Sequence, residues 1–173
     1  WTAAGDCKDC AVGLYNDQTA RTAATDCKSC PLGLYNDQAA QDSVSDCKDC
    51  ASGLYNDQAG QDAAADCKNC AVGKYMDEPG WDTAACKACA AGLYNDQVAQ
   101  AACKDCAPGL WNDQTAQDAA SDCKGCPEGK YNEQTGQDAA ADCKVCALGL
   151  YNDQTAQDAA ADCKACVAGK YND

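Results

Sequence analysis

Cysteine is the residue with the greatest chemical potential in this chain, because thiols form disulfides, bind zinc and exchange electrons. The 18 cysteines fall into nine C-x-x-C pairs. Successive pairs start 20 residues apart, except for steps of 19 and 17 residues on either side of Cys86. The pairs are Cys7/Cys10, Cys27/Cys30, Cys47/Cys50, Cys67/Cys70, Cys86/Cys89, Cys103/Cys106, Cys123/Cys126, Cys143/Cys146 and Cys163/Cys166. Such a fixed period is typical of a tandem repeat array.

Three disulfide schemes fit this spacing. In the first scheme, the second cysteine of each pair bonds the first cysteine of the next pair, which makes every repeat identical. In the second scheme, neighbouring pairs bond crosswise, as Cys7–Cys27 with Cys10–Cys30, and one of the nine pairs is left over. In the third scheme, each C-x-x-C closes on itself and constrains the chain little. We favour the first scheme and keep the others open; it predicts Cys10–Cys27, Cys30–Cys47, Cys50–Cys67, Cys70–Cys86, Cys89–Cys103, Cys106–Cys123, Cys126–Cys143 and Cys146–Cys163.

The first scheme leaves Cys7 and Cys166 without partners inside the chain, and such leftover cysteines suggest intermolecular pairing. Both ends of the sequence cut the repeat. If two copies were joined head to tail, Cys166 would precede the next Cys7 by 14 positions, which is also the spacing from Cys89 to Cys103. We therefore expect the chain to continue as a longer array of the same repeats or to polymerise head to tail through Cys166–Cys7.

Zinc binding is the main alternative use of the cysteines, since C-x2-C-x16-C-x2-C fits the spacing of zinc sites built from four cysteines. A multi-zinc repeat protein with four cysteines at each site would again leave one of the nine pairs unused. Enzymatic chemistry lacks its usual residues, because the chain contains no His and therefore no Ser–His or Cys–His dyad. We expect no enzymatic activity.

The sequence also offers oxygen ligands for calcium. The repeated N-D-Q motif, with Asn16 and Asp17 as its first copy, supplies hard oxygen atoms. A solvated acidic turn explains the same residues more simply, because Asn and Asp stabilise turns locally. We therefore expect no cofactor and keep calcium at Asn16 and Asp17 as a weaker alternative.

The composition excludes a conventional hydrophobic core. Leu and Val together make 14 of 173 residues, Ile and Phe are absent, and the net charge is −14. Disulfides are the simplest replacement for the missing core, and they imply an oxidising compartment, so we expect an extracellular or cell-surface location. With 13 basic against 27 acidic residues we expect no nucleic-acid binding. No segment is apolar enough to predict membrane insertion.

The text between the cysteine pairs predicts the fold. A Gly stands three residues after each second cysteine and an aromatic residue follows two positions later, which indicates a turn and a short extended segment. The Ala- and Asp-rich tail could be a helical turn or a returning strand. We expect one continuous array over 1–173: an elongated solenoid of about nine ~20-residue disulfide-rich loops, mostly coil and turn with short β-strands and little helix.

Two repeats, 70–86 and 89–103, depart from the pattern. The first carries an unusual cluster around Met76, Pro79 and Trp81, and the second is three residues short. These departures predict a bend in the array or a distinct surface, and neutral drift within a repeat array explains them equally well. Our candidates for lateral or partner contacts are Trp1, Met76, Pro79, Trp81 and Trp111.

The C-x-x-G-x-Y…D-C-x-x-C text resembles the cysteine-rich repeats of ephrin-receptor-like and TNF-receptor-like ectodomains. Residues 10–15, 30–35 and 126–131 carry the resemblance best. In those families this motif opens a loop that the first cysteine of the next pair closes, which supports the first disulfide scheme. The tandem array is also similar to ciliate immobilisation antigens and other protist surface proteins.

The near-identity of the repeats favours a structural array over a surface that reads a ligand. We expect an extracellular structural protein that forms a fibre, filament or surface coat, with copies of itself as the main partner. Thr, Ser and Pro residues could carry glycans. The alternative hypothesis is a receptor-like or adhesive ectodomain that binds a protein partner through the irregular repeats.

Overall fold

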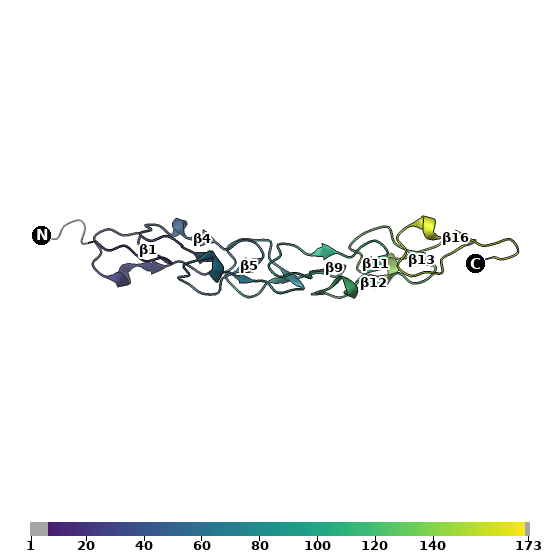
Figure 1. Ribbon diagram of the computed structural model, residues 1–173, viewed down its shortest axis with the longest axis horizontal. Coiled ribbons are helices and arrows are strands. Elements are labelled where there is room, and N and C mark those ends of the chain that lie inside the picture. The colour runs from purple at the N-terminus through teal and green to yellow at the C-terminus, as the bar shows by residue number, and fades with distance from the viewer. Residues whose placement is uncertain (1–6, 172–173) are drawn as a thin grey trace. The chain divides into compact units, whose positions relative to one another are not determined.

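The fold is a series of small hairpins, seen in a computed structural model that describes residues 7–171 (Figure 1). Every strand is two residues long, and each hairpin is a separate antiparallel two-stranded sheet, so the described residues form no closed sheet. The pairs are β1 (Leu14–Tyr15) with β2 (Lys28–Ser29), β3 (Leu34–Tyr35) with β4 (Lys48–Asp49), β5 (Leu54–Tyr55) with β6 (Lys68–Asn69), β7 (Lys74–Tyr75) with β8 (Lys87–Ala88), β9 (Leu93–Tyr94) with β10 (Lys104–Asp105), β11 (Leu110–Trp111) with β12 (Lys124–Gly125), β13 (Lys130–Tyr131) with β14 (Lys144–Val145), and β15 (Leu150–Tyr151) with β16 (Lys164–Ala165).

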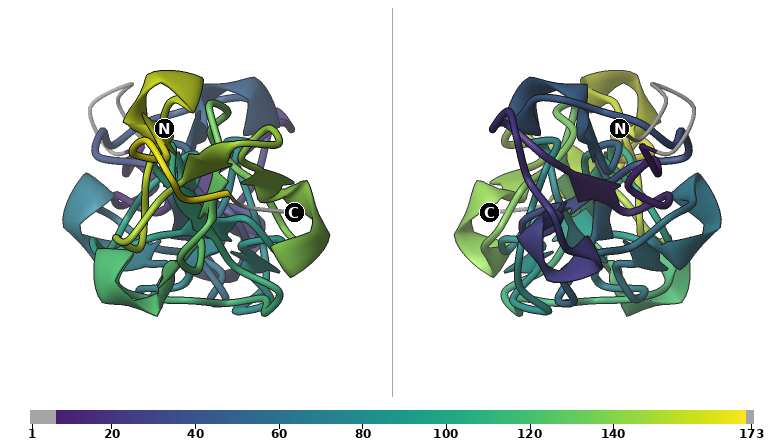
Figure 2. Two further views of the ribbon diagram at one scale, coloured as in Figure 1. Left: turned by 90° about the vertical axis from the view of Figure 1, so that its right-hand side faces the viewer. Right: turned by 90° about the vertical axis from the view of Figure 1, so that its left-hand side faces the viewer.

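The tail of each regular repeat forms a short 3₁₀ turn rather than a returning strand. The turns are η2 (Ala24–Asp26), η3 (Val44–Asp46), η4 (Ala64–Asp66), η5 (Ala120–Asp122), η6 (Ala140–Asp142) and η7 (Ala160–Asp162). The Asp before the cysteine closes each turn, as where Oδ2 of Asp26 accepts a hydrogen bond of 3.0 Å from the N–H of Ala23. Figure 2 shows the light-green η6 and the yellow η7 on the outside of the C-terminal repeats.

The two irregular repeats lack this turn, and residues 83–84 and 101–102 form bends instead. The reason is local, because Ala85 and Ala102 stand before the cysteine where other repeats have Asp. Alanine has no side-chain oxygen to accept the backbone N–H that closes the turn.

The chain groups into two compact units, which we describe separately. Unit 1 extends to Ala71 and includes Met76–Cys86 and Ala99–Ala101; unit 2 contains Val72–Tyr75, Lys87–Val98 and the chain from Ala102 onward. Within each unit a hairpin also bonds to the next repeat, as where Tyr15 forms a parallel bridge with Gln41 and Trp111 does so with Gln137.

Apart from Met76, the core consists of cysteine and asparagine rather than large apolar residues. The second cysteines of the pairs are the most deeply buried, with Cys30, Cys50, Cys70, Cys89, Cys106 and Cys126 at 0% exposure. These findings confirm the expectation of small disulfide-rich repeats with short strands and little helix.

Candidate functional site

Eight disulfides close the repeats, and each joins the second cysteine of one pair to the first cysteine of the next. The Cα–Cα distances are 5.7–5.8 Å, and the partners are 17 positions apart except for two closer pairs, at 16 and 14 positions, in the irregular repeats. The bonds are Cys10–Cys27, Cys30–Cys47, Cys50–Cys67, Cys70–Cys86, Cys89–Cys103, Cys106–Cys123, Cys126–Cys143 and Cys146–Cys163. This is the sequential arrangement.

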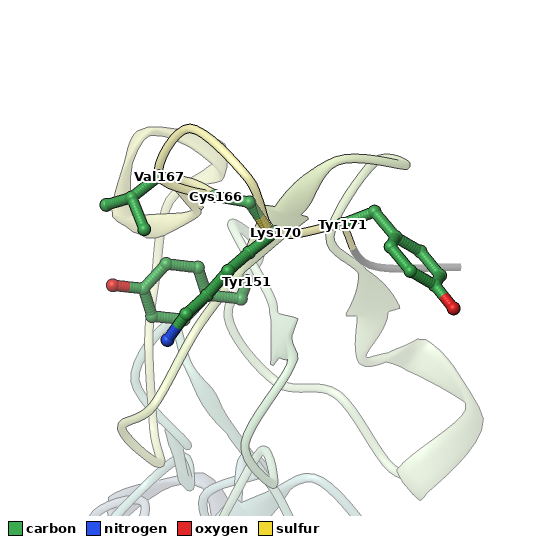
Figure 3. A pocket seen from close by; sticks show the side chains of 5 residues that line it. All are labelled: Tyr151, Cys166, Val167, Lys170 and Tyr171. Atoms are coloured by element: carbon green, nitrogen blue, oxygen red, sulfur yellow. The ribbon is translucent and has the colours of Figure 1, made fainter.

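The two cysteines left with free thiols are Cys7 and Cys166. Cys7 is exposed in unit 1, and Cys166 is partly buried in unit 2. Cys166 lines a shallow hollow together with Tyr151, Val167, Lys170 and Tyr171 (Figure 3). A free thiol beside exposed apolar side chains can form a disulfide with another molecule.

The repeated Gly sits where two segments of backbone meet. Gly13 has a φ of +78°, and a β-carbon there would overlap the carbonyl oxygen of Gly60 and lie 2.9 Å from its carbonyl carbon. The same would happen at Gly33, where the carbonyl carbon of Gly80 would be 2.7 Å away. Glycine is therefore required for two reasons: the backbone has a positive φ, and a loop two repeats later approaches closely. Gly53, Gly73, Gly92 and Gly109 are covered in the same way.

Within each unit a column of buried Asn residues connects the repeats, and sequence reasoning missed it. Asn56 is fully buried; its Nδ2 donates to the Leu34 carbonyl at 2.9 Å, and its Oδ1 accepts from the N–H of Gln58 at 3.1 Å. Its own carbonyl accepts from the N–H of Gly33 at 2.8 Å, and its N–H donates to the Trp81 carbonyl at 2.9 Å. The side chain and backbone of this one residue thus join three repeats. The equivalent residues Asn36, Asn95, Asn112, Asn132 and Asn152 are 0–5% exposed.

The signal that could have revealed this column is the Asn that follows nearly every aromatic residue in the repeats. The sequence interpretation assigned that Asn to a solvated turn or to calcium. Burial explains its recurrence better, because most buried polar side chains are hydrogen-bonded, as the Nδ2 atoms of Asn36, Asn56, Asn95 and Asn152 are. In Asn112 and Asn132 the Nδ2 atom is buried without a partner among the described residues.

Met76 replaces the Asn in its repeat, and its side chain is fully buried. Its backbone keeps the usual bonds, accepting from the N–H of Gly53 at 2.7 Å and donating to the Gln100 carbonyl at 3.1 Å. The expectation that Met76 offers a surface contact is therefore wrong, because the residue occupies a core position. An unbranched, flexible side chain suits a space shaped for Asn.

The other expected contact residues differ in accessibility. Pro79 is exposed, and Trp81 and Trp111 are partly buried. The indole nitrogens of both Trp residues are buried without a hydrogen-bond partner among residues 7–171. The Lys124 ammonium lies over the Trp111 ring, 4.7 Å from its centroid, which is cation–π geometry. Trp1 lies outside the described residues.

An exposed row of ion pairs runs along the hairpins. Lys28 donates to Asp17 at 2.7 Å, and the same pairing recurs in Lys48–Asp37, Lys68–Asp57, Lys104–Asp96, Lys124–Asp113, Lys144–Glu133 and Lys164–Asp153. The lysine hydrogen bond lowers the pKa of the Asp57 carboxyl, and the Asp57 carboxylate raises the pKa of Lys68. Each pair is about half exposed, so its contribution to stability is small.

The oxygen atoms suggested for calcium already have partners inside the repeat. Asn16 Oδ1 accepts from the N–H of Gln18 at 3.1 Å, and both carboxylate oxygens of Asp17 accept from Lys28 at 2.7 and 2.8 Å. Across residues 7–171 no three His, Cys, Asp or Glu side chains come together as metal ligands do. Sixteen of the 18 cysteines are in disulfides, so they offer zinc no thiolates.

Comparison with known proteins agrees with this geometry. Residues 2–47 match the family described as tyrosine-protein kinase ephrin type A/B receptor-like. A search of curated proteins finds no match to the chain. Within residues 7–171, no helix has the length and apolar character needed to cross a membrane. The chain is built from tandem, disulfide-rich, cysteine-rich repeats that resemble ephrin-receptor-like modules, and such repeats fit an extracellular domain.

Proposed function

We propose that this protein is an extracellular structural protein whose repeats build a fibre, filament or surface coat. The observation that carries the proposal is the uniform connection between successive repeats within each unit. The N–H of Gly13 donates to the Asn36 carbonyl at 2.8 Å, and the N–H of Gly109 donates to the Asn132 carbonyl at 2.7 Å. Since each repeat offers its successor the same bonds, the arrangement can be extended by adding repeats.

The repeats supply mechanical strength through covalent loops. Each disulfide restricts the unfolded chain and contributes roughly 3 kcal/mol in a loop-entropy treatment. The bonds lie in series along the sequence, so that local opening of one repeat leaves the closed loops of the others intact. A net charge of −14 keeps such a chain soluble and separates neighbouring molecules. Glycans on Ser, Thr or Pro would add to this spacing. The proposal assigns the protein no enzymatic role.

Electron microscopy tests the proposal directly. We expect the purified chain, kept under oxidising conditions, to give regular filaments or sheets by negative staining, and we expect dithiothreitol to abolish them. A matched sample in which free thiols are blocked with iodoacetamide before assembly separates the roles of the internal disulfides from those of Cys7 and Cys166. A chain that remains monomeric and dispersed at every concentration and salt level would contradict a fibre or coat.

A receptor-like or adhesive ectodomain is the second candidate, and the family match over residues 2–47 favours it. Its binding surface would have to use the accessible part of the irregular repeat, namely Pro79 and the outer face of Trp81, because Met76 is buried. A Pro79→Ala chain immobilised beside the unchanged chain tests this idea. Loss of a protein captured from the source organism's surface extract, with filaments unchanged, would favour the receptor-like role.

A further inference from the structure

The disulfides form a short covalent path through the repeats. In a regular repeat, this path crosses from Cys50 to Cys67 through the bond and then follows only three positions to Cys70. At ~3.5 Å per residue, those positions and the 5.8 Å between the bonded α-carbons allow at most about 16 Å for each repeat. The same 20 positions would reach about 70 Å without the disulfide. The residues inside the closed loops, which we call the hidden loops, therefore cannot be extended by tension on the chain.

The three-position link between successive disulfides is bonded to the loop that it follows. Strand β4 pairs with β3 inside the closed loop, and the N–H of Cys50 donates to the Gly33 carbonyl at 2.9 Å. The buried Asn residues stand inside the hidden loops, as Asn56 does between Cys50 and Cys67. While the disulfides are intact, tension bypasses the hydrogen bonds of Asn56. Once a disulfide is cut, tension acts on them directly.

The 3₁₀ turn holds the backbone before the first cysteine of a pair. In one regular repeat, Oδ2 of Asp66 accepts from the N–H of Ala63 at 3.0 Å, and the N–H of Cys67 donates to the carbonyl three residues back at 3.2 Å. The two irregular repeats lack this turn, and the N–H of Cys86 reaches back only two residues, to the Ala84 carbonyl at 3.0 Å. A segment with fewer backbone bonds opens locally at a lower free-energy cost.

The exposure of the bonded cysteines differs in the same direction. Six disulfides, from Cys30–Cys47 to Cys126–Cys143, have repeats on both sides, and in each of them the second cysteine of a pair is fully buried. A reductant must therefore attack at the other sulfur of the bond. Cys86 and Cys103 are partly exposed, as is Cys67 behind its intact turn. The remaining attackable cysteines are only 3–9% exposed: Cys47, Cys123 and Cys143.

We propose that Cys70–Cys86 and Cys89–Cys103 are the sites at which a thiol reductant opens the repeat array, and that their reduction releases two hidden loops while the regular disulfides stay closed. Loop entropy does not distinguish these bonds, since it changes little between separations of 14, 16 and 17 positions. Access through the missing turn does. This inference goes beyond the fibre or coat role, because it concerns a single chain under tension.

A dithiol is the reductant in this exchange. One of its thiolates attacks Sγ of Cys86, forms a mixed disulfide and expels the Cys70 thiolate, which takes up a proton. The second thiolate of the reductant then attacks the reductant's own sulfur in the mixed disulfide and expels the Cys86 thiolate, which is also protonated. The protein gains two electrons and two protons, and the dithiol loses them as it closes to a disulfide.

The two loops have lengths that identify them. At ~3.5 Å per residue, and after subtraction of the distance across the bond, reduction releases about 50 Å at Cys70–Cys86 and about 43 Å at Cys89–Cys103. A regular loop, whose cysteines are 17 positions apart, releases about 54 Å. The size of each lengthening event therefore tells which class of disulfide was cut.

Force spectroscopy of single chains measures this released length. The chain is held by peptide tags at its two ends, at a force at which its length stays constant without reductant, and dithiothreitol is then added. We expect the first two steps, converted to contour length, to be the short ones of about 50 and 43 Å, with steps of about 54 Å following later. The double Ser variant of Cys70–Cys86 should lose the 50 Å step and keep the 43 Å step.

Mass spectrometry identifies the same bonds without tension. Cys7 and Cys166 are first blocked with iodoacetamide, the chain is treated briefly with dithiothreitol, and new thiols are trapped with isotope-labelled iodoacetamide. We expect Cys86 and Cys103 to be labelled about fivefold faster than Cys47, the size of effect that a missing capping bond has on local opening.

Two variants of one regular repeat separate the effect of the turn from the effect of charge. Asp66→Ala removes the carboxylate that closes the turn, so we expect Cys50–Cys67 to be reduced about fivefold faster. Asp62→Ala is the matched control, because it removes an exposed carboxylate four positions away and leaves the turn closed. Its rate of reduction should equal that of the unchanged chain.

Equal labelling of Cys47 and Cys86, first steps of about 54 Å, or an unchanged rate in Asp66→Ala would overturn the proposal. Electron microscopy of the unreduced chain separates this failure from failure of the fibre proposal. Filaments whose disulfides are all reduced at one rate would retain the fibre and reject the two reducible sites. A dispersed chain that gives the short steps first would retain the two sites and reject the fibre.

Discussion

The carbonyl of Gly60 lies over the α-carbon of Gly13, although two repeats separate these residues in the sequence. A β-carbon at Gly13 would be 2.9 Å from the Gly60 carbonyl carbon, closer than side-chain carbons come to backbone. The loops that carry Gly13, Gly33, Gly53, Gly73, Gly92 and Gly109 are thus held by their disulfides and also by a loop two repeats later. Stability therefore depends on backbone approach as much as on covalent bonds.

The covered glycines should tolerate no side chain. We expect Gly33→Ala to destabilise the protein by about 2 kcal/mol or more, since it adds left-handed strain to a collision with the Gly80 carbonyl. Gly60→Ala should cost only about 1 kcal/mol, because its main penalty is the φ of +74°. Guanidinium unfolding without reductant, followed by tyrosine fluorescence, compares the two. Equal midpoints would show that the close approach at Gly33 is not needed.

The buried Asn positions should tolerate a neutral side chain but not a charged one. We expect Asn56→Asp to destabilise the protein by about 2 kcal/mol at neutral pH, because it buries a carboxylate facing the Leu34 carbonyl. Burial raises the pKa of the new carboxyl above its unfolded value, so the loss should be largest above the raised pKa and shrink as pH falls below it.

Asn16→Asp is the matched control for that measurement, because Asn16 is half-buried and starts the column. We measure urea unfolding of both variants at pH 3, 5 and 7. We expect a pH-dependent loss of unfolding free energy only in Asn56→Asp. A pH-independent deficit in Asn56→Asp would mean that the side chain is not enclosed.

The lysine–aspartate pairs predict that the stability of the fold depends modestly on pH, with one limit in acid and one in base. The pKa of Asp57 is lowered, so its contribution is present above the ordinary value of 3.8 and is lost as pH falls through the lower folded value. The pKa of Lys68 is raised, so its contribution is complete below 10.5 and is lost as pH rises through the higher folded value. We expect Asp57→Asn to reduce the thermal midpoint slightly between these limits and to have no effect at pH 2.

Asp62→Asn removes the same charge from an exposed position outside the pairs and serves as the control. In 1 M NaCl the difference between the two variants should disappear, because salt screens exposed pairs. A difference that persists in high salt would argue against an electrostatic origin.

Disulfide removal should cost about the same in regular and irregular repeats. We expect the double Ser variants of Cys50–Cys67 and Cys89–Cys103 each to lose about 3 kcal/mol, since loop-closure entropy changes little between separations of 17 and 14 positions. Hydrogen exchange measured by mass spectrometry should locate the loosening in the affected repeat and its two neighbours. Loosening spread evenly over the whole chain would contradict the repeat-by-repeat organisation.

Calcium should leave the protein unchanged. Because the Asp17 carboxylate already accepts from Lys28 and Asn16 Oδ1 from Gln18, a cation would have to displace both partners. We expect the thermal midpoint and the native mass to be the same in 5 mM EDTA and in 5 mM CaCl₂. A midpoint raised by calcium but not by magnesium would assign the N-D-Q motif to metal binding.

The sequence by itself determined the repeat and its lack of a conventional core. The cysteine spacing is a local feature, and it favours the sequential bonds over the crosswise and self-closed schemes. Asp26 shows where local information also specifies a turn, because its side chain reaches back only three residues to Ala23. The absence of that Asp at Ala85 and Ala102 explains the two repeats without a 3₁₀ turn.

Only the tertiary structure decided what covers each Gly and what surrounds each Asn. The partners of Gly13 and Asn56 lie one or two repeats away, and a repeating sequence provides the same candidate partners at every offset. Met76 shows the consequence: its position in an unusual segment suggested a surface, yet its backbone bonds place it in the Asn column. The choice among offsets depends on how one hairpin stacks on the next, which is set by packing and backbone hydrogen bonds over distances that local patterns do not encode.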